Sequence, residues 1–353
     1  MKSSSIDRRQ FLTSVASSAA VLGAGASNVF AAAQPRRIRI GFLGASHSHA
    51  EGKLRVVQAS SEYELVGACE ESPEARRRCE QLGVKLMAQD ELLDRCAVIA
   101  VESPVRDHAA HAMAALKAGK HVHLEKAPAA NFEDVKQIVA LARDRKLLLQ
   151  TGYMWRYHPG FKAIFEAVRQ GWLGDVVMVR ATMTKTLSPE ARKEWAEFKG
   201  GSMFELGGHL IDPIVRLMGR PKSIQPTLRH HGKHDDDLKD NNVVVFEFDR
   251  ALAVLTDTAL QPTKAPERSF EVVGTRGSAM LRSIEPPVFS IELSEAAGSY
   301  RKGLQTVPLP DYRRYEGDFV ELAAAVRGER ALTAALDEEL LVQECLLRAS
   351  GML

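Results

Sequence analysis

Residues 97–128 read AVIAVESPVRDHAAHAMAALKAGKHVHLEKAP, and this stretch decides the fold. It begins with a short apolar run, residues 97–101, which is typical of a strand buried on both faces. From residue 105 to 118 small and apolar residues recur at helical spacing, and Gly119 follows as a stop signal. Residues 121–124 form a second short apolar run. The pattern therefore predicts a strand, a helix and a second, parallel strand.

The two strands of such a unit end at the same edge of the sheet, where open parallel sheets bind ligands. Ser103 and Pro104 follow the first strand, and Glu125 and Lys126 follow the second. Further strand-like runs at residues 38–43, 63–68, 84–87 and 147–151 alternate with helical patterns. We therefore expect an α/β, doubly wound parallel sheet over residues 36–152.

The turn Gly44-Ala-Ser-His-Ser-His49 occupies the position where a dinucleotide-binding domain carries GxGxxG. Only Gly44 is retained, with Ser46 and His49 at the other two glycine positions. The Ser46 hydroxyl and the amides at the helix start suit a pyrophosphate. Glu70, at the end of the second strand, would accept hydrogen bonds from ribose and repel a 2′-phosphate, which favours NAD over NADP. Alternatively, Glu70 caps the helix that starts near Ser72.

The pattern SP…H…AALKAGKHVHLEKAPA resembles the TP…H…AL.AGKHV..EKP.A signature of the glucose-fructose oxidoreductase/inositol dehydrogenase (Gfo/Idh/MocA) family. The resemblance implies a Rossmann domain in which Lys126 lies beside the nicotinamide and the substrate hydroxyl. One departure is that the proline comes one place late, as Pro128. The cofactor-binding residues that we predict are Gly44, Ser46, His47, His49, Glu70, Ser103, Pro104, His108, Glu125 and Lys126.

Residues 153–353 show a different pattern, with six alternating strand-like runs and short turns. It predicts an α+β domain with a large, mostly antiparallel open sheet. We expect helices to cover one face of that sheet and the other face to pair subunits into a homodimer or homotetramer. Two helices, near residues 312–327 and 337–350, are expected to close the chain.

Residues 200–212, GGSMFELGGHLID, carry the second chemical motif. In a helix starting near residue 202, Glu205, His209 and Asp212 share one face. The segment resembles the family's GG…D-x-G-x-H-x-x-D motif, which implies that His209 takes a proton from a sugar hydroxyl while hydride goes to the nicotinamide. Glu205 or Asp212 would orient the imidazole. A histidine of ordinary pKa about 6.5 suits such a base; the alternative is a surface histidine near a helix start.

Residues 152–159, GYMWRYHP, also resemble a family segment, one that ends in R-[FY]-x-P and helps to form the floor of the active site. Tyr153, Arg156 and His158 therefore join Asp212 as candidate substrate-binding residues. Each of the first three could equally be a packing residue between domains.

Bulk properties exclude some function classes. A net charge of +2 without a basic stripe argues against nucleic acid, and no later segment is apolar enough to span a membrane. The four cysteines lack metal spacing, and we interpret them as mostly buried thiols rather than disulfides. His230, His231 and His234 lie in a polar stretch that we interpret as a solvated loop, so no metal site is predicted.

Residues 6–12, IDRRQFL, resemble a twin-arginine export motif, followed by an apolar run and Ala31-Ala-Ala33. We expect residues 1–34 to be a signal peptide and the protein to be periplasmic, without a lipid anchor because no cysteine ends the segment. A frayed N-terminal helix is the alternative. An exported dehydrogenase has no free nicotinamide pool, so its dinucleotide should stay tightly bound and be restored in each turnover.

The sequence thus predicts an NAD-dependent oxidoreductase, with NADP less favoured, acting on a sugar or cyclitol through Lys126 and His209. One alternative uses transient oxidation of the sugar to eliminate a glycosidic substituent. The other is a non-catalytic sugar-binding protein that has lost its dinucleotide.

Overall fold

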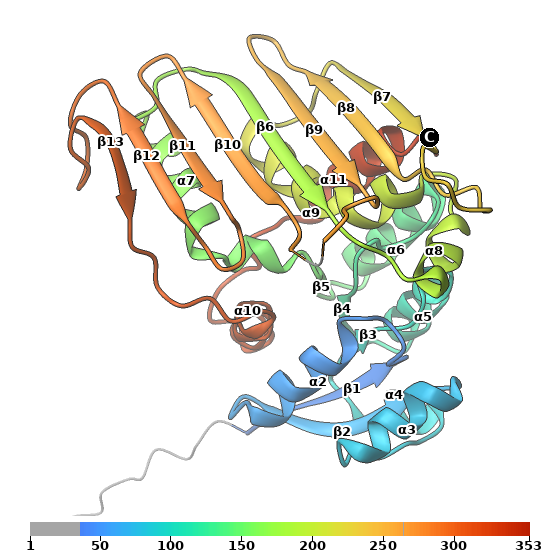
Figure 1. Cartoon of the computed structure of the whole chain (residues 1–353). Helices are drawn as coiled ribbons and strands as arrows, with labels where there is room; N and C mark the ends of the chain where they lie inside the picture. Colours follow the sequence, from blue (N-terminus) through green and yellow to red (C-terminus); the bar gives the residue numbers. More distant parts are fainter. Residues whose placement is uncertain (1–35, 264) are drawn as a thin grey trace, which may run out of the picture. The chain divides into compact units, whose positions relative to one another are not determined.

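A computed structural model describes residues 36–353 except residue 264, and within it Arg37–Leu353 form one compact unit. The predicted signal peptide therefore lies outside the described residues. No helix of the described part is long and apolar enough to cross a membrane. The unit holds two sheets, a parallel one and a larger mixed one (Figure 1).

The parallel sheet has the strand order β2-β1-β3-β4-β5. Its strands are β1 (Ile38–Leu43), β2 (Tyr63–Cys69), β3 (Val98–Val101), β4 (His121–Leu124) and β5 (Leu149–Thr151). The connecting helices are α2 (Ala50–Ala59), α3 (Pro73–Gln81), α4 (Gln89–Arg95), α5 (Val105–Lys117) and α6 (Phe132–Asp144). Every residue of β3 is fully buried, as its uninterrupted apolar run predicts. The doubly wound sheet is therefore confirmed.

One expected strand is missing from this sheet. Residues 84–87 form only an isolated bridge, from Leu86 to Ala68 of β2, before α4 begins. The segment makes only this one bridge because α4 begins at Gln89, three residues after Leu86. The sheet consequently has five strands.

The second sheet has eight strands in the order β13-β12-β11-β10-β6-β9-β8-β7. They are β6 (Val176–Thr184), β7 (Ser223–Arg229), β8 (Asn241–Glu247), β9 (Leu252–Thr258), β10 (Arg268–Gly274), β11 (Gly277–Arg282), β12 (Phe289–Leu293) and β13 (Gly303–Val307). All neighbours pair antiparallel except β6 and β9, which are parallel. The large, mostly antiparallel sheet is confirmed, whereas its two edge strands, β7 and β13, were not predicted.

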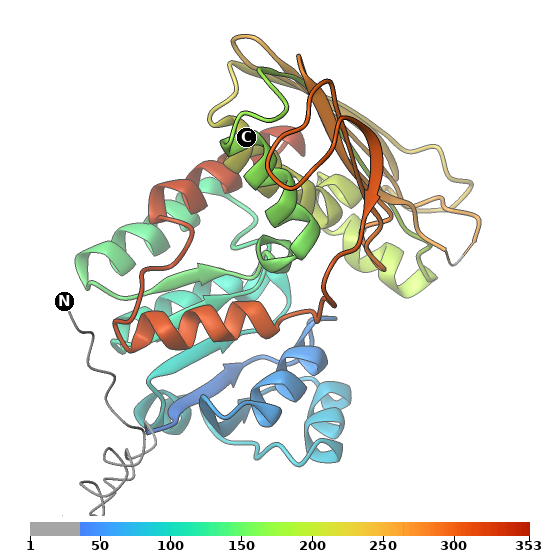
Figure 2. The ribbon, with the colours of Figure 1, turned by 90° about the vertical axis from the view of Figure 1, so that its left-hand side faces the viewer.

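Helices lie between the two sheets and join them. α9 (Gly201–Met218) packs against β6 and β9, and α11 (Leu336–Ala349) packs against both α9 and α6 (Figure 1). α10 (Glu316–Val326) contacts α2 on the parallel-sheet side (Figure 2). The remaining helical elements, none of them predicted, are η1 (Met154–Tyr157), α7 (Pro159–Arg169) and α8 (Pro189–Ala196). The last helices of the chain thus contact both halves, so each half depends on the other for part of its core.

Candidate active site

The carboxyl ends of β1, β3 and β4 meet because these strands are neighbours in the sheet. The turn after β1 is tied to the turn after β3 by a hydrogen bond from the His47 amide to the Glu102 carbonyl, 3.0 Å. Gly44 has φ +77°, and a Cβ there would lie 2.4 Å from Cα of Ser103. The one retained glycine is therefore the one that this close approach requires.

The turn also carries groups that suit a dinucleotide. Ser46 Oγ is buried and has no hydrogen-bond partner among the described residues, so a hydroxyl is available where a pyrophosphate would lie. Glu70 accepts hydrogen bonds from the Ala45 amide at 2.5 Å and the Ser72 amide at 2.7 Å. Ser72 itself is the N-cap of α3. The cap of α3 is therefore Ser72 and not Glu70, whose carboxylate instead connects the turn with the residues just before α3, at the edge where a ribose would bind.

Beneath this edge lies a buried charge network that sequence reasoning missed. Lys53 of α2 is fully buried, and its Nζ donates to Glu102 at 2.6 Å and to Glu125. His123 Nε2 lies 2.8 Å from the same Nζ. The only signal in the sequence was the place of Lys53 on the helix face that also carries Ala50, Leu54 and Val57, all buried.

Burial and the charge of Lys53 shift the pKa values of Glu102 and Glu125 in opposite directions. Burial, partly offset by Lys53, raises the pKa of Glu102 to about 8. Burial acts in the same direction on Glu125, but the attraction of Lys53, helped by the hydrogen bond with His49, holds the pKa of Glu125 well below its usual value. Near neutral pH, Glu125 is therefore the carboxylate that carries the charge.

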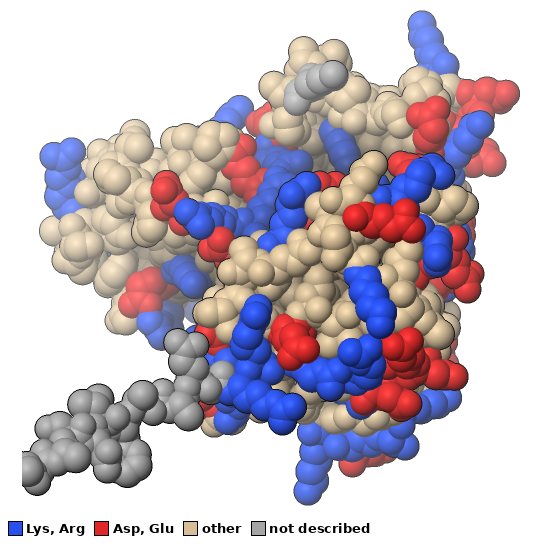
Figure 3. Space-filling model, turned by 90° about the horizontal axis from the view of Figure 1, so that it is seen from below, with Lys and Arg blue, Asp and Glu red and all other residues tan. Residues whose placement is uncertain are grey.

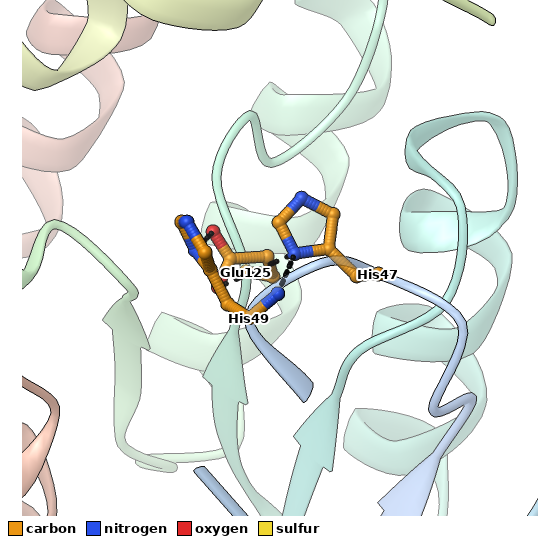
Figure 4. A group of neighbouring side chains, drawn as sticks. All are labelled: His47, His49 and Glu125. Atoms are coloured by element: carbon orange, nitrogen blue, oxygen red, sulfur yellow. Dashed lines mark hydrogen bonds and ion pairs between the residues drawn. The ribbon is translucent and has the colours of Figure 1, made fainter. Parts of the chain in front are cut away.

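Glu125 organises the histidines of the turn. Its Oε1 accepts a hydrogen bond from the Lys126 amide at 2.9 Å and lies 3.2 Å from His49 Nδ1. His47 Nδ1 lies 4.0 Å from Glu125 Oε2 (Figure 4). Burial lowers the pKa of both histidines, so both imidazoles are neutral near pH 7.

Lys126 connects this edge to α9. Its Nζ donates to the Glu205 carbonyl at 3.0 Å and reaches the Glu205 carboxylate at 3.4 Å. One turn further along α9, His209 packs between Trp155, with ring centroids 5.1 Å apart, and His49, at 5.9 Å. The structure thus brings Lys126, Glu205 and His209 together, as predicted from two motifs far apart in the sequence.

His209 is placed as a proton acceptor. Burial, then the charge of Lys126, lowers its pKa well below the ordinary value. Its Nδ1 is buried and meets no hydrogen-bond partner within the part of the chain that the structure describes. The prediction that Glu205 or Asp212 orients the His209 imidazole is therefore wrong. Glu205 contacts Lys126, and Asp212 contacts another residue.

That residue is Arg156. Its guanidinium contacts Asp212 Oδ1 at 2.6 and 2.9 Å and Glu339 at 2.6 and 2.8 Å, with the arginine side chain 2% exposed. This clamp ties η1 to α9 and α11. Arg156 and Asp212 are therefore held by each other, which favours the packing alternative for Arg156, and a substrate contact of either residue stays a prediction.

The other predicted residues divide into packing and site positions. His158 caps α7, accepting from the Gly160 amide at 3.1 Å, and its Nε2 lies 2.9 Å from the Ile284 carbonyl, so it has the packing role. His108 lies 2.8 Å from the carbonyls of both Ser103 and Ala127 and braces the edge. Pro104 is the N-cap of α5. Tyr153 keeps a buried hydroxyl with no partner in the described structure, so it stays a candidate for substrate contact.

Cationic residues of the large sheet add to the site. Arg268 of β10 contributes to the lowered pKa of His209, and Lys185, just after β6, has a pKa lowered by burial and by Lys126. Both line a cavity of about 490 Å³ together with Thr186, Leu187, Ser188, Thr263 and Pro266. Neither was predicted, because a single basic residue at a strand end carries no motif.

The second histidine-rich stretch is organised differently. Asp236 and Asp240 both bind the guanidinium of Arg192, at 2.7 and 2.9 Å. His230 Nδ1 lies 2.9 Å from the Leu238 carbonyl. The polar loop is therefore fixed by an arginine clamp.

Known proteins share this architecture. Residues 38–153 match the model of the oxidoreductase family with an NAD-binding Rossmann fold, and residues 161–280 match the GFO/IDH/MocA C-terminal domain. A dTDP-3,4-didehydro-2,6-dideoxy-α-D-glucose 3-reductase from Streptomyces violaceoruber is 29% identical over 71% of this chain and 75% of its own length. A scyllo-inositol 2-dehydrogenase (NADP⁺) from Bacillus subtilis is 25% identical over 68% of this chain and 72% of its own.

Among solved structures, GenD2 from gentamicin A biosynthesis, in complex with NAD, superposes with a TM-score of 0.76 at 21% identity, covering 90% of this chain and 94% of that one. This likeness shows the fold. The first family model spans all five strands of the parallel sheet, and the second spans β6 to β10 and the start of β11 in the large sheet. The chain therefore belongs to the Gfo/Idh/MocA family of NAD-binding oxidoreductases.

Proposed function

We propose that the protein oxidises or reduces a sugar or cyclitol, with NAD held at the turn after β1 and Lys126 and His209 as the catalytic pair. The observation that carries the proposal is the contact of Lys126, at the end of β4, with the turn of α9 that precedes His209. An ammonium group and a neutral imidazole thus border one site, as transfer of a proton and a hydride at a C–OH group requires.

Two features of the turn support the dinucleotide. The buried Ser46 hydroxyl has no partner among the described residues, and the Gly44 backbone passes close to Ser103 without a side chain between them. Glu70 favours NAD, since its carboxylate would repel a 2′-phosphate. NAD, when bound, supplies the hydride acceptor.

The chain's own residues have separate tasks in this proposal. Lys126 donates to the substrate oxygen, and Glu205 holds the Lys126 ammonium in place. His209, neutral and buried, takes the hydroxyl proton. Tyr153, Lys185 and Arg268 offer the hydrogen-bond donors for the remaining sugar hydroxyls.

The decisive experiment is to denature the purified protein and analyse the supernatant for NAD and NADP. We expect about one NAD per chain, and nicotinamide absorbance that changes when a sugar or cyclitol is added. A protein that releases no dinucleotide and binds none when it is supplied would refute the proposal in favour of a non-catalytic sugar-binding protein.

A second candidate is favoured by the imidazole of His49, which lies beside Glu125 and faces His209. Two proton acceptors suit a reaction in which one sugar carbon is oxidised, the neighbouring C–H proton is removed, the glycosidic substituent leaves and the hydride is returned. Release of free sugar without net change in nicotinamide absorbance would support it.

Export and assembly are further parts of the proposal. Residues 6–12 support twin-arginine export to the periplasm, and Arg8→Lys with Arg9→Lys should retain the protein in the cytoplasm. The large sheet exposes Val243 and Leu252, each 41% exposed, which suits pairing of subunits through that face. Val243→Asp should then lower the mass measured by light scattering.

Lys and Arg alternate with Asp and Glu on the face in Figure 3, so that face has no uniform charge to attract nucleic acid.

A further inference from the structure

His47, His49 and Glu125 form a cluster that the proposed chemistry leaves partly unexplained. The two histidines follow β1 as an H-x-H pair, and Glu125 follows β4. One ligand atom from each residue lies within 4.8 Å of the others. Figure 4 shows both imidazoles turned toward the carboxylate, and the side chains are only 8%, 15% and 0% exposed.

We propose that His47, His49 and Glu125 bind one divalent first-row transition-metal ion, such as Zn²⁺ or Mn²⁺. Two imidazoles and one carboxylate on one side of an ion form the facial arrangement that leaves coordination positions open. The distance of 3.2 Å from His49 Nδ1 to Glu125 Oε1 is already that of two ligands sharing an ion. Ligand atoms that share an ion at about 2.1 Å in a facial arrangement lie about 3.0–3.4 Å apart, so the distance of 4.0 Å from His47 Nδ1 to Glu125 Oε2 would need to shorten by about 0.6–1 Å.

Other buried ionisable groups surround the cluster. Glu102, Glu125 and Asp318 are all fully buried, and Lys53 is the buried ammonium that they share. Neither carboxylate oxygen of Asp318 has a hydrogen-bond partner in the described part of the chain. Burial favours the protonated forms of Glu102 and Asp318, so Glu125 and Lys53 are the charged pair beside the cluster.

Binding of the ion would break two existing hydrogen bonds. The ion would replace the hydrogen bond between His49 and Glu125 and the one from the His49 amide to His47 Nδ1, 3.2 Å. Lys53 would stay on Glu125 and hold the carboxylate in place. One of the three ligands, Glu125, is thus already held in place by a hydrogen bond from Lys53, as metal-binding carboxylates usually are.

The ion would serve the substrate pocket, because the His49 ring faces His209 at 5.9 Å between centroids. Its open positions would take two adjacent oxygens of the sugar, a hydroxyl and its neighbour. This role rests on the proposed function, whereas binding of the ion does not.

The test uses the untagged full chain, stripped with EDTA and titrated calorimetrically with ZnCl₂ and with MnCl₂. We expect one ion per chain for at least one of the two metals, and a loss of affinity of about tenfold or more in His49→Gln and in His47→Gln. His234→Gln, at an exposed loop position, is the matched control and should bind as the unchanged protein does. Circular dichroism establishes that each variant is folded, and either histidine variant alone suffices.

Stoichiometric binding by neither metal, or unchanged affinity in a folded His47→Gln or His49→Gln protein, would overturn the inference. The dinucleotide content of the same samples separates the two proposals. NAD without an ion leaves the dehydrogenase proposal standing and removes the metal site. An ion without NAD does the reverse.

Discussion

Replacing Arg156 by methionine tests whether this arginine is structural or substrate-binding. Its guanidinium makes four contacts of 2.6–2.9 Å with Asp212 and Glu339, and its side chain is 2% exposed. Methionine would leave two buried carboxylates without their cation, and breaking a buried ion pair costs about 3–5 kcal/mol. For a chain of this size, each kcal/mol lowers the melting temperature by roughly 2 °C, so we expect a drop of about 6–10 °C.

The assay is urea unfolding followed by fluorescence, together with KM for the sugar once it is known. Arg156→Met combined with Asp212→Asn and Glu339→Gln should recover most of the loss, since the neutral set leaves no buried charge unpaired. Arg180→Met removes an exposed pair with Glu271 and should cost at most about 1 kcal/mol, which makes it the control. An Arg156→Met protein within about 1 kcal/mol of the parent, with KM raised, would refute the structural role.

Three further predictions concern the site and the pH dependence of stability. Lys126→Met should lower kcat/KM by about 10²–10³-fold while NAD stays bound, because a donor to the reacting oxygen is lost; steady-state kinetics with released-NAD analysis measures both. Glu70→Gln should weaken the preference for NAD over NADP by about tenfold or more, measured as the ratio of the two dissociation constants; an unchanged ratio would mean that Glu70 only holds the turn after β1 against the start of α3. Burial raises the pKa of Asp257 to about 7, so the folded protein holds a proton that the unfolded chain loses near pH 4, and stability falls as the pH rises between these values. Asp257→Asn should remove that fall. In urea unfolding, the free energy of unfolding of the variant minus that of the parent should therefore rise by up to about 4 kcal/mol from pH 4 to pH 8; parallel pH profiles would contradict it.

The sequence predicted the two sheets because their inner strands carry clear apolar patterns. It missed β7 and β13, whose residues are all at least partly exposed, so that neither edge strand has a buried face to mark it. β7 even contains Pro226, which an edge strand tolerates.

Site residues were predictable where a sequence motif contains them. They were not predictable where their role depends on partners far away in the sequence. Lys126, Glu205 and His209 belong to local patterns and meet as expected. Arg156 finds its partners 56 and 183 residues away, so nothing local could distinguish a clamp from a substrate contact. Lys53 was missed for the same reason, since its partners Glu102 and Glu125 are 49 and 72 residues distant.

The double attachment of α11 has a consequence for biosynthesis. Glu339 holds Arg156, and Gln343 donates to the Ala129 carbonyl at 2.7 Å, so this helix fastens segments that the ribosome makes some 200 residues earlier. A nascent chain lacking residues 336–349 can assemble its Rossmann strands, yet it lacks these two fastenings between the halves of the molecule. We therefore expect the two halves to be fully fastened to each other only after translation ends, when this last helix has docked.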